Sequence, residues 1–152
     1  MPRRTNGPRG QREMRMPLHT PVTILVIDDA PSFARALALL LRRDGYTVAT
    51  AGNGNLALAW LEERRYDVIL CDLHMPDLDG RAFYAILTSQ YPALRQRVIF
   101  LTGDTLGADS TAFLEQCGQP WLAKPCTIVA IRSAIAHVLR LAPPLRPPCH
   151  AS

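Results

Sequence analysis

Short apolar segments alternate with longer amphipathic segments along the chain, and this alternation limits the fold more than any other feature. The short segments lie at residues 22–28, 46–50, 68–72, 97–102 and 121–123, and most are rich in β-branched side chains. Such runs are typical of strands that are buried on both faces of a sheet. Each is followed by a segment with apolar residues at helical spacing. The order therefore predicts five successive strand–helix units.

Five such units predict an α/β fold. Strands that alternate with helices form a parallel sheet, with right-handed crossovers and helices on both faces. The expected architecture is a flavodoxin-like (βα)5 doubly wound parallel sheet with strand order 2-1-3-4-5. A closed eight-fold barrel would need roughly twice the length of this chain.

The charge distribution divides the chain into three segments. The net charge is +4, but residues 1–20 alone hold five arginines and one glutamate, and the remaining residues hold 12 basic and 12 acidic side chains. We expect a basic, disordered tail at residues 1–20, one folded domain at 21–141 and a proline-rich tail at 142–152. The balanced charge of the domain argues against a basic stripe for nucleic acid.

Targeting and redox signals are weak. The longest apolar runs are far shorter than the roughly 18 residues that a membrane span needs. The N-terminal arginines are not followed by the apolar stretch of a secretory signal. The four cysteines form no CxxC pair and no metal-binding pattern with the histidines. The sequence therefore predicts a cytoplasmic protein with reduced thiols and no contact with a membrane.

Polar side chains stand at the carboxyl ends of four of the five predicted strands. Asp28 and Asp29 end the first strand, Asp72 ends the third and Thr102 the fourth, and Lys124 follows the fifth. In the order 2-1-3-4-5 these four strands are neighbours, and ligands bind beyond this edge in open parallel sheets. Any one of these residues alone would be an ordinary polar strand end. Together they predict a site.

The chemistry of this set points to a hard cation and a phosphate. Three carboxylates within a few ångströms would raise one another's pKa unless a cation lies among them. Oxygen ligands without Cys or His favour Mg²⁺. Lys124 is the only lysine among 17 basic residues. A compact ammonium can contact a carboxylate and then a phosphoryl oxygen, whereas the wider guanidinium of Arg would not fit the same space.

These motifs resemble the response regulator receiver domains of bacterial two-component signalling. The resemblance extends from Val22 to Leu141 and depends on the ordered set of Asp28-Asp29, VILCDLHMPDLDG, LTGD and an aromatic residue shortly before KP. No single motif is specific, although DLHMPDLDG after a strand is a strong signal. The resemblance implies a signalling phosphoacceptor rather than an enzyme.

The family resemblance also assigns roles at the site. It implies that Asp72 is the phosphoacceptor, which takes its phosphoryl group from the phosphohistidine of a histidine kinase. It implies that Asp29 and Asp72 hold Mg²⁺ directly, with the backbone carbonyl of His74 as a further ligand, and that Asp28 holds the ion through water.

The remaining roles concern the phosphoryl group and the switch. By resemblance, Thr102 and Lys124 contact phosphoryl oxygens, and Thr102 moves on activation. Pro125 is expected to follow a cis peptide bond.

The resemblance also suggests roles for Trp121, His74 and Asp104, and for two of these residues an alternative stays open. Trp121 stands where the family places its switch aromatic, and a plain core aromatic is the equal alternative. His74 and Asp104 flank the position of the hydrolytic water and would tune the lifetime of the phosphoryl group. His74 is alternatively a surface histidine without such a role.

The partners follow from the same resemblance. We expect a histidine kinase, a hybrid kinase or a phosphotransfer protein, with a homodimer through the last two helices and the last strand as a further arrangement. The chain after Leu141 is too short for an output domain, so no DNA-binding domain and no membrane partner are expected.

Three alternatives stay open. The chain could be a degenerate receiver that acts as a phosphorylation-independent binding module. It could be an aspartyl-phosphate phosphatase of the haloacid dehalogenase type, although His74 stands where that class has an acid. It could also be a domain cut from a hybrid kinase, whose receivers the stretch from Leu101 to Cys126 also resembles.

Overall fold

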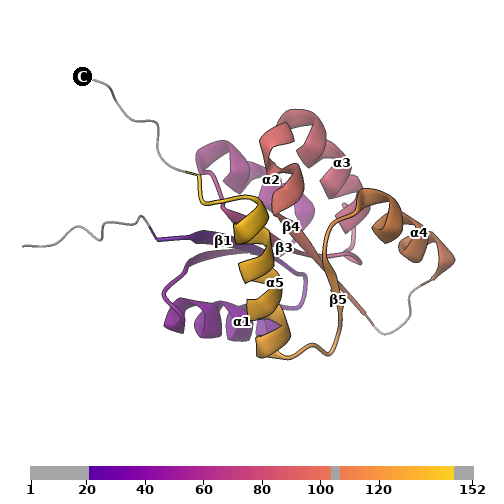
Figure 1. Cartoon of the computed structure of the whole chain (residues 1–152). Coiled ribbons are helices and arrows are strands. Elements are labelled where there is room, and N and C mark those ends of the chain that lie inside the picture. Colours follow the sequence, from indigo (N-terminus) through magenta and orange to yellow (C-terminus); the bar gives the residue numbers. More distant parts are fainter. Residues whose placement is uncertain (1–20, 104–106, 146–152) are drawn as a thin grey trace, which may run out of the picture.

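The computed structural model describes residues 21–103 and 107–145 as one α/β domain (Figure 1). Its five-stranded sheet has the order β2-β1-β3-β4-β5, and every neighbouring pair is parallel. The strands are β1 (Thr23–Ile27), β2 (Thr47–Ala51), β3 (Val68–Asp72), β4 (Val98–Thr102) and β5 (Trp121–Ala123). The predicted flavodoxin-like fold and strand order are confirmed.

Helices cover both faces of the sheet. They are α1 (Pro31–Arg43), α2 (Gly54–Glu63), α3 (Gly80–Gln90), α4 (Ala108–Cys117) and α5 (Ile128–Leu141), with a 3-10 turn, η1 (Pro92–Arg97), before β4. Helices α1 and α5 pack on one face, and α2, α3 and α4 pack on the other (Figure 1). This is the two-sided burial that near-continuous apolar strands require.

Successive residues of each central strand point to opposite faces. In β1, Ile24 and Val26 pack toward α1 and α5, whereas Leu25 and Ile27 pack toward α2 and α3. All four side chains are fully buried. Because side-chain direction alternates along a strand, this one segment contributes to the hydrophobic layers on both faces of the sheet.

Side-chain caps fix where three of the helices begin. Asn53, Asp79 and Thr127 each accept a hydrogen bond from the backbone N–H three residues later, at 2.8, 2.8 and 3.1 Å. Each cap satisfies a donor that the first helical turn leaves unpaired. The predicted start of α2 at the Asn53–Asn55 turn and the predicted bounds of α1, β3, α3 and β5 agree with the structure.

An aromatic cluster joins α3, β4 and α4. The ring centroids of Tyr84 and Phe100 lie 5.4 Å apart, and so do those of Phe100 and Phe113. These two pairs and the pair of Tyr84 with Phe113 all meet edge to face. Edge-to-face pairs add to the stabilisation from burial alone. The predicted inward residues of α3 included Phe83 and Leu87, which are fully buried, but not Tyr84, which is also buried.

A buried carboxylate ties the start of the sheet to the segment after α5. Asp67 Oδ2 accepts hydrogen bonds from the backbone N–H of Thr23 at 2.9 Å and from the Thr23 hydroxyl at 3.1 Å. Its Oδ1 accepts from the N–H of Leu145 at 2.7 Å. One side chain therefore joins β1 to the chain beyond the last helix.

A buried guanidinium completes this arrangement, which we call the amino-end anchor (Asp67 and Arg97 with their partners). Arg97 Nη1 donates to the carbonyls of Asp67 and Ala142, both at 3.1 Å, and Nη2 donates to the carbonyl of Pro143 at 2.7 Å. Burial lowers the pKa of Arg97, and the negative charge of Asp67 opposes that shift. Sequence patterns gave no sign of this anchor.

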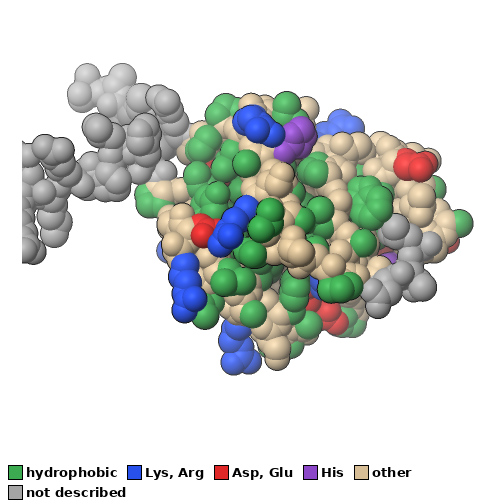
Figure 2. Space-filling view, turned by 60° about the horizontal axis from the view of Figure 1, so that its bottom comes forward, with side chains coloured by type: hydrophobic (Ala, Val, Ile, Leu, Met, Phe, Trp, Pro, Cys, Tyr) green, Lys and Arg blue, Asp and Glu red, His purple; other side chains and the backbone are tan. Residues whose placement is uncertain are grey.

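Figure 2 shows basic and acidic side chains scattered over the face in view, without a contiguous basic patch. Arg132 and Asp44 form an ion pair at 2.7 Å. Among the residues that the structure describes, no helix combines the length and the apolarity that a bilayer crossing requires. The described cysteines, Cys71, Cys117 and Cys126, are free thiols. The predicted tail at 1–20, residues 146–152 and Asp104 lie outside the described residues.

Candidate functional site at the carboxyl end of the sheet

The two aspartates after β1 lie in different environments. Asp28 is 2% exposed, whereas Asp29 is exposed. Asp28 Oδ1 accepts a hydrogen bond from the Ala30 N–H at 2.8 Å, which fixes the turn into α1. Its Oδ2 faces Lys124. Asp28 is therefore held in place, and Asp29 is open to a ligand.

Asp72 is the last residue of β3 and is 6% exposed. Its Oδ1 accepts a hydrogen bond from the His74 N–H at 3.1 Å. Burial raises the pKa of Asp72, and the negative charges of Asp28 and Asp29 raise it further, while the His74 hydrogen bond and the Lys124 charge oppose the shift. The carboxylate therefore favours any cation that approaches it.

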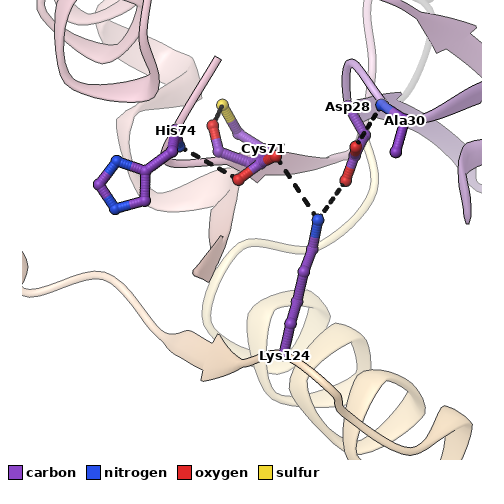
Figure 3. Close-up of polar contacts among 6 residues, drawn as sticks. Asp28, Ala30, Cys71, His74 and Lys124 are labelled. Atoms are coloured by element: carbon purple, nitrogen blue, oxygen red, sulfur yellow. Dashed lines mark hydrogen bonds and ion pairs between the residues drawn. The ribbon is translucent and has the colours of Figure 1, made fainter. Parts of the chain in front are cut away.

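Lys124 reaches from the end of β5 into the space between two carboxylates (Figure 3). Its Nζ lies 2.6 Å from Asp28 Oδ2 and 3.5 Å from Asp72 Oδ2. Burial alone would lower the pKa of Lys124. The hydrogen bond to Asp28 and the charges of Asp72 and Asp28 outweigh that effect, so the pKa is raised. Lys124 is an ammonium that partly neutralises the acidic group.

The three carboxylates form a group that could hold a metal ion. One oxygen from each of Asp28, Asp29 and Asp72 lies within 4.8 Å of the others. The donors are oxygens alone, and one of the three residues is exposed to solvent. This set fits a hard cation such as Mg²⁺, which binds through one or two carboxylates and keeps several waters.

Thr102 supplies a hydroxyl at the same edge of the sheet. It is the last residue of β4, it is fully buried, and among the described residues its Oγ1 has no hydrogen-bond partner. A buried hydroxyl without a partner is unfavourable. A ligand with a free oxygen beside Asp72 would remove that penalty.

Close packing holds the first residue of α3 against the backbone at the end of β3. A Cβ at Gly80 would lie 2.7 Å from the backbone oxygen of Asp72 and 2.8 Å from Leu73 Cα. Only glycine permits this approach, and sequence reasoning assigned Gly80 no role beyond starting a helix. Within the loop, His74 is exposed and Met75 is buried, so the histidine side chain points to solvent.

The remaining predicted residues are placed less centrally. Trp121 is 40% exposed on the edge strand β5, so the alternative of a plain core aromatic does not describe it. The Lys124–Pro125 peptide bond is cis, as expected. Asp104 falls in the segment that the structure does not describe.

Sequence reasoning missed one neighbour of the site. The ring of Phe33, in the first turn of α1, has its centroid 4.4 Å from Lys124 Nζ. The sequence marked Phe33 only as an apolar helix position. Its place shortly after Asp28-Asp29 was the available signal, because the start of that helix lies at the same end of the sheet.

Comparisons with known proteins agree with this geometry. The family model of the response regulator receiver domain matches residues 24–136. The chain is 35% identical over 120 residues to "Probable transcriptional regulatory protein TcrX" of Mycobacterium tuberculosis, covering 79% of this chain and 50% of that protein. It is 33% identical over 102 residues to "DNA-binding response regulator MtrA" of Mycolicibacterium smegmatis, covering 67% of this chain and 43% of that protein.

Solved structures with the same fold include receiver domains. The signal receiver domain of a signal transduction histidine kinase from Syntrophus aciditrophicus aligns with a TM-score of 0.73 and 30% identity, over 86% of this chain and 99% of that one. The chemotaxis protein CheY4 of Vibrio cholerae aligns with a TM-score of 0.71 and 26% identity, over 79% of this chain and 100% of that one.

The comparisons correct the predicted partners. The expectation of no DNA-binding domain is wrong for the proteins that this chain resembles. Curated relatives are named transcriptional regulators, and one is named a DNA-binding response regulator. The chain spans 50% of the length of the TcrX protein and 43% of the length of the MtrA protein.

The five-stranded fold, the acidic group beside Lys124 and the match over residues 24–136 lead to one conclusion. The chain belongs to the response regulator receiver domain family of two-component signalling.

Proposed function

We propose that this receiver accepts a phosphoryl group on Asp72 from the phosphohistidine of a histidine kinase. The observation that carries the proposal is the juxtaposition, at one edge of the sheet, of three carboxylates, a lysine and a buried hydroxyl that has no hydrogen-bond partner among the described residues. A carboxylate nucleophile flanked by cationic and hydroxyl groups suits transfer of a phosphoryl group, in which positioning and charge neutralisation carry most of the catalysis.

The transfer step balances without a protein acid or base. An Asp72 carboxylate oxygen forms a bond to phosphorus while the phosphorus–nitrogen bond to the donor histidine breaks. The electron pair of that bond returns to the imidazole nitrogen, and the ring leaves as neutral imidazole because its other nitrogen carries a proton taken from solvent. The product is an acyl phosphate on Asp72, which water later hydrolyses. His74 and Asp104 are predicted to tune that hydrolysis.

The chain's own residues would orient the group. Lys124 would move part of its contact from Asp28 to a phosphoryl oxygen, and the Thr102 hydroxyl would donate to another. Asp28, Asp29, Asp72 and the carbonyl of His74 would hold Mg²⁺, which supplies charge neutralisation at the phosphoryl oxygens when bound. The oxygen-only donor set supports this choice of ion.

Other expectations keep the status of proposals. We take residues 21–141 as the receiver domain, Trp121 as the residue that reports the switch, and the cytoplasm as the predicted location. The link between phosphorylation and a distant surface would be a coupling of about 1–3 kcal/mol.

Phosphorylation by a small donor tests the proposal directly. The full chain is incubated with Mg²⁺ and acetyl phosphate, and intact-protein mass spectrometry follows the addition of one phosphoryl group. The wild-type chain should take up one group that hydroxylamine removes, as expected for an acyl phosphate. Asp72→Asn should take up none. Asp77→Asn is the matched control, because Asp77 is an exposed carboxylate in the same loop and asparagine tolerates its φ of 66°.

The outcomes separate the alternatives. Folded wild-type protein that takes up no group, with Mg²⁺ present, would favour a degenerate receiver that acts as a binding module. Continuous release of phosphate from unrelated phosphoesters would favour a phosphatase. Modification of the Asp72→Asn variant at the wild-type level would exclude Asp72 as the acceptor.

A further inference from the structure

The lysine of the site has an aromatic neighbour in addition to the carboxylates. Lys124 Nζ lies 4.4 Å from the centroid of the Phe33 ring. An ammonium this close to an aromatic ring is attracted by the negative face of its π system. Phe33 belongs to α1 and Lys124 follows β5, so this contact joins two segments that are far apart in the sequence.

The ring adds a third neighbour to the two carboxylates around the ammonium. A lysine ammonium has three donors. Carboxylate oxygens of Asp28 and Asp72 lie 2.6 and 3.5 Å from Nζ, and the side chain of Lys124 is 22% exposed. The ring of Phe33 covers a third side. The ammonium therefore has two anionic groups and one π face as neighbours and keeps only part of its contact with solvent.

We propose that Phe33 is a positioning residue for Lys124: its ring face holds the ammonium beside Asp72, where an incoming phosphoryl oxygen would meet it. This inference deepens the proposed phosphoacceptor function and depends on it. When the phosphoryl group arrives, the ammonium turns from Asp28 toward the new oxygen. The ring lets it turn without exchanging its remaining surroundings for water, because a π face attracts a cation over a range of positions.

Packing and positioning can be separated at this residue. Phe33 is half-buried, and its ring also packs against the hydrophobic layer formed by α1 and α5. Leucine would fill part of that space without a π face. Tyrosine would keep both the packing and the π face, and the partial exposure of Phe33 leaves room for its hydroxyl. The pair Phe33→Leu and Phe33→Tyr therefore isolates the electrostatic part.

The single lysine makes the contact directly measurable. Because Lys124 is the only lysine in the chain, selective ¹³C and ¹⁵N labelling of lysine yields a single set of side-chain signals in the NMR spectrum. Ring current should shift the ε-methylene protons of Lys124 upfield in the wild-type chain and in Phe33→Tyr. In Phe33→Leu they should lie at their ordinary position.

The kinetic arm uses the same proteins. With acetyl phosphate and Mg²⁺, Phe33→Leu should be phosphorylated about three- to tenfold more slowly than wild type, the range expected for a partly desolvated cation–π contact. Phe33→Tyr should restore the wild-type rate. Leu40→Ala, a half-buried change elsewhere on α1, should lower stability to urea without moving the lysine signal or the rate.

A failure of the positioning role can be distinguished from a failure of the proposed phosphoacceptor function. If the wild-type chain is phosphorylated and Phe33→Leu keeps both its rate and its lysine signal, the positioning role is refuted and the proposed function stands. A Phe33→Tyr variant that is as slow as Phe33→Leu would likewise refute it, because packing alone would explain the loss. If the wild-type chain takes up no phosphoryl group, the proposed function fails, and the positioning role fails with it.

Discussion

Burial of the Asp72 carboxylate makes the stability of the chain depend on pH. Burial raises the pKa of Asp72 in the folded state, with further contributions from the charges of Asp28 and Asp29. The folded state therefore prefers the protonated form more than the unfolded state does. Ionised Asp72 destabilises the fold at a pH above its folded-state pKa, and this penalty disappears as the pH falls through that pKa.

This linkage predicts a stabilising substitution. In metal-free buffer at a pH above the folded-state pKa of Asp72, Asp72→Asn should raise the free energy of unfolding. The gain should shrink as the pH is lowered and Asp72 of the wild type becomes protonated. Urea denaturation across the pH range measures the difference.

The control and the metal test share the same measurement. Asp77→Asn changes an exposed carboxylate and should leave the free energy of unfolding within about 0.5 kcal/mol of wild type. Added Mg²⁺ should stabilise the wild type more than Asp72→Asn, because an ion that binds only the folded state adds its binding free energy to folding. Equal stability of Asp72→Asn and wild type at every pH would contradict the linkage.

At the residue scale, the sequence located the site but not its internal arrangement. The carboxyl ends of parallel strands meet at one edge of a sheet. The sequence therefore predicted that Asp72 and Lys124 lie close together. That Asp28 is buried while Asp29 is exposed depends on how the chain turns into α1, and two consecutive aspartates carry no signal of that turn. The contact of Phe33 with Lys124 depends on side-chain directions from two distant elements.

At the scale of elements, the junction between β3 and α3 controls the site. The Gly80 Cα lies so close to the Asp72 carbonyl and to Leu73 Cα that an added Cβ would meet them at 2.7 and 2.8 Å. Both contacts are with backbone atoms, which cannot move aside as a flexible side chain would. The β3–α3 loop is therefore positioned by direct backbone packing.

Gly80→Ala should consequently destabilise the domain by about 1–3 kcal/mol, the usual cost of overpacking. It should also slow phosphorylation, because the strain displaces the backbone that carries Asp72 and His74. Gly52→Ala is the matched control, since nothing lies within 4 Å of a Cβ at that position. Urea denaturation and the acetyl phosphate assay provide the two readings, and a Gly80→Ala variant as stable as Gly52→Ala would count against this packing.

The elements themselves were largely predictable from the sequence, for identifiable reasons. Apolar runs with β-branched residues located the strands, and the polar caps Asn53 and Thr127 located helix starts. The structure begins β1 at Thr23 and ends it at Ile27, one residue inside the predicted bounds at each end. The polarity of Asp28 does not exclude it from a strand, so composition could not define that limit.

At the scale of the whole molecule, the carboxyl end of the sheet carries the candidate site and the amino end carries a structural anchor. The carboxyl end holds the acidic group and Lys124. The amino end holds the amino-end anchor, in which Asp67 and Arg97 join β1 and β4 to the chain beyond α5. Sequence reasoning found the first because its residues follow strands. It missed the second because a single Arg and a single Asp before strands resemble ordinary surface charges.

The anchor predicts a large effect of one buried arginine. Arg97→Met removes donors to the carbonyls of Asp67, Ala142 and Pro143 and should lower the free energy of unfolding by roughly 2–4 kcal/mol. Arg95→Met is the control, because Arg95 is exposed in the same 3-10 turn and should change stability by less than about 0.5 kcal/mol. Equal urea midpoints for the two variants would contradict the anchor's contribution.

The amino-end anchor also determines how the domain would respond to mechanical load. The Asp67 carboxylate and the Arg97 guanidinium bind the backbone from Ala142 to Leu145. A pulling force applied at the C-terminus would reach these hydrogen bonds before it reached the last turn of α5. Such a force would first load the amino end of the sheet, where the anchor lies. The loops around Asp72, at the opposite end, would carry little of it.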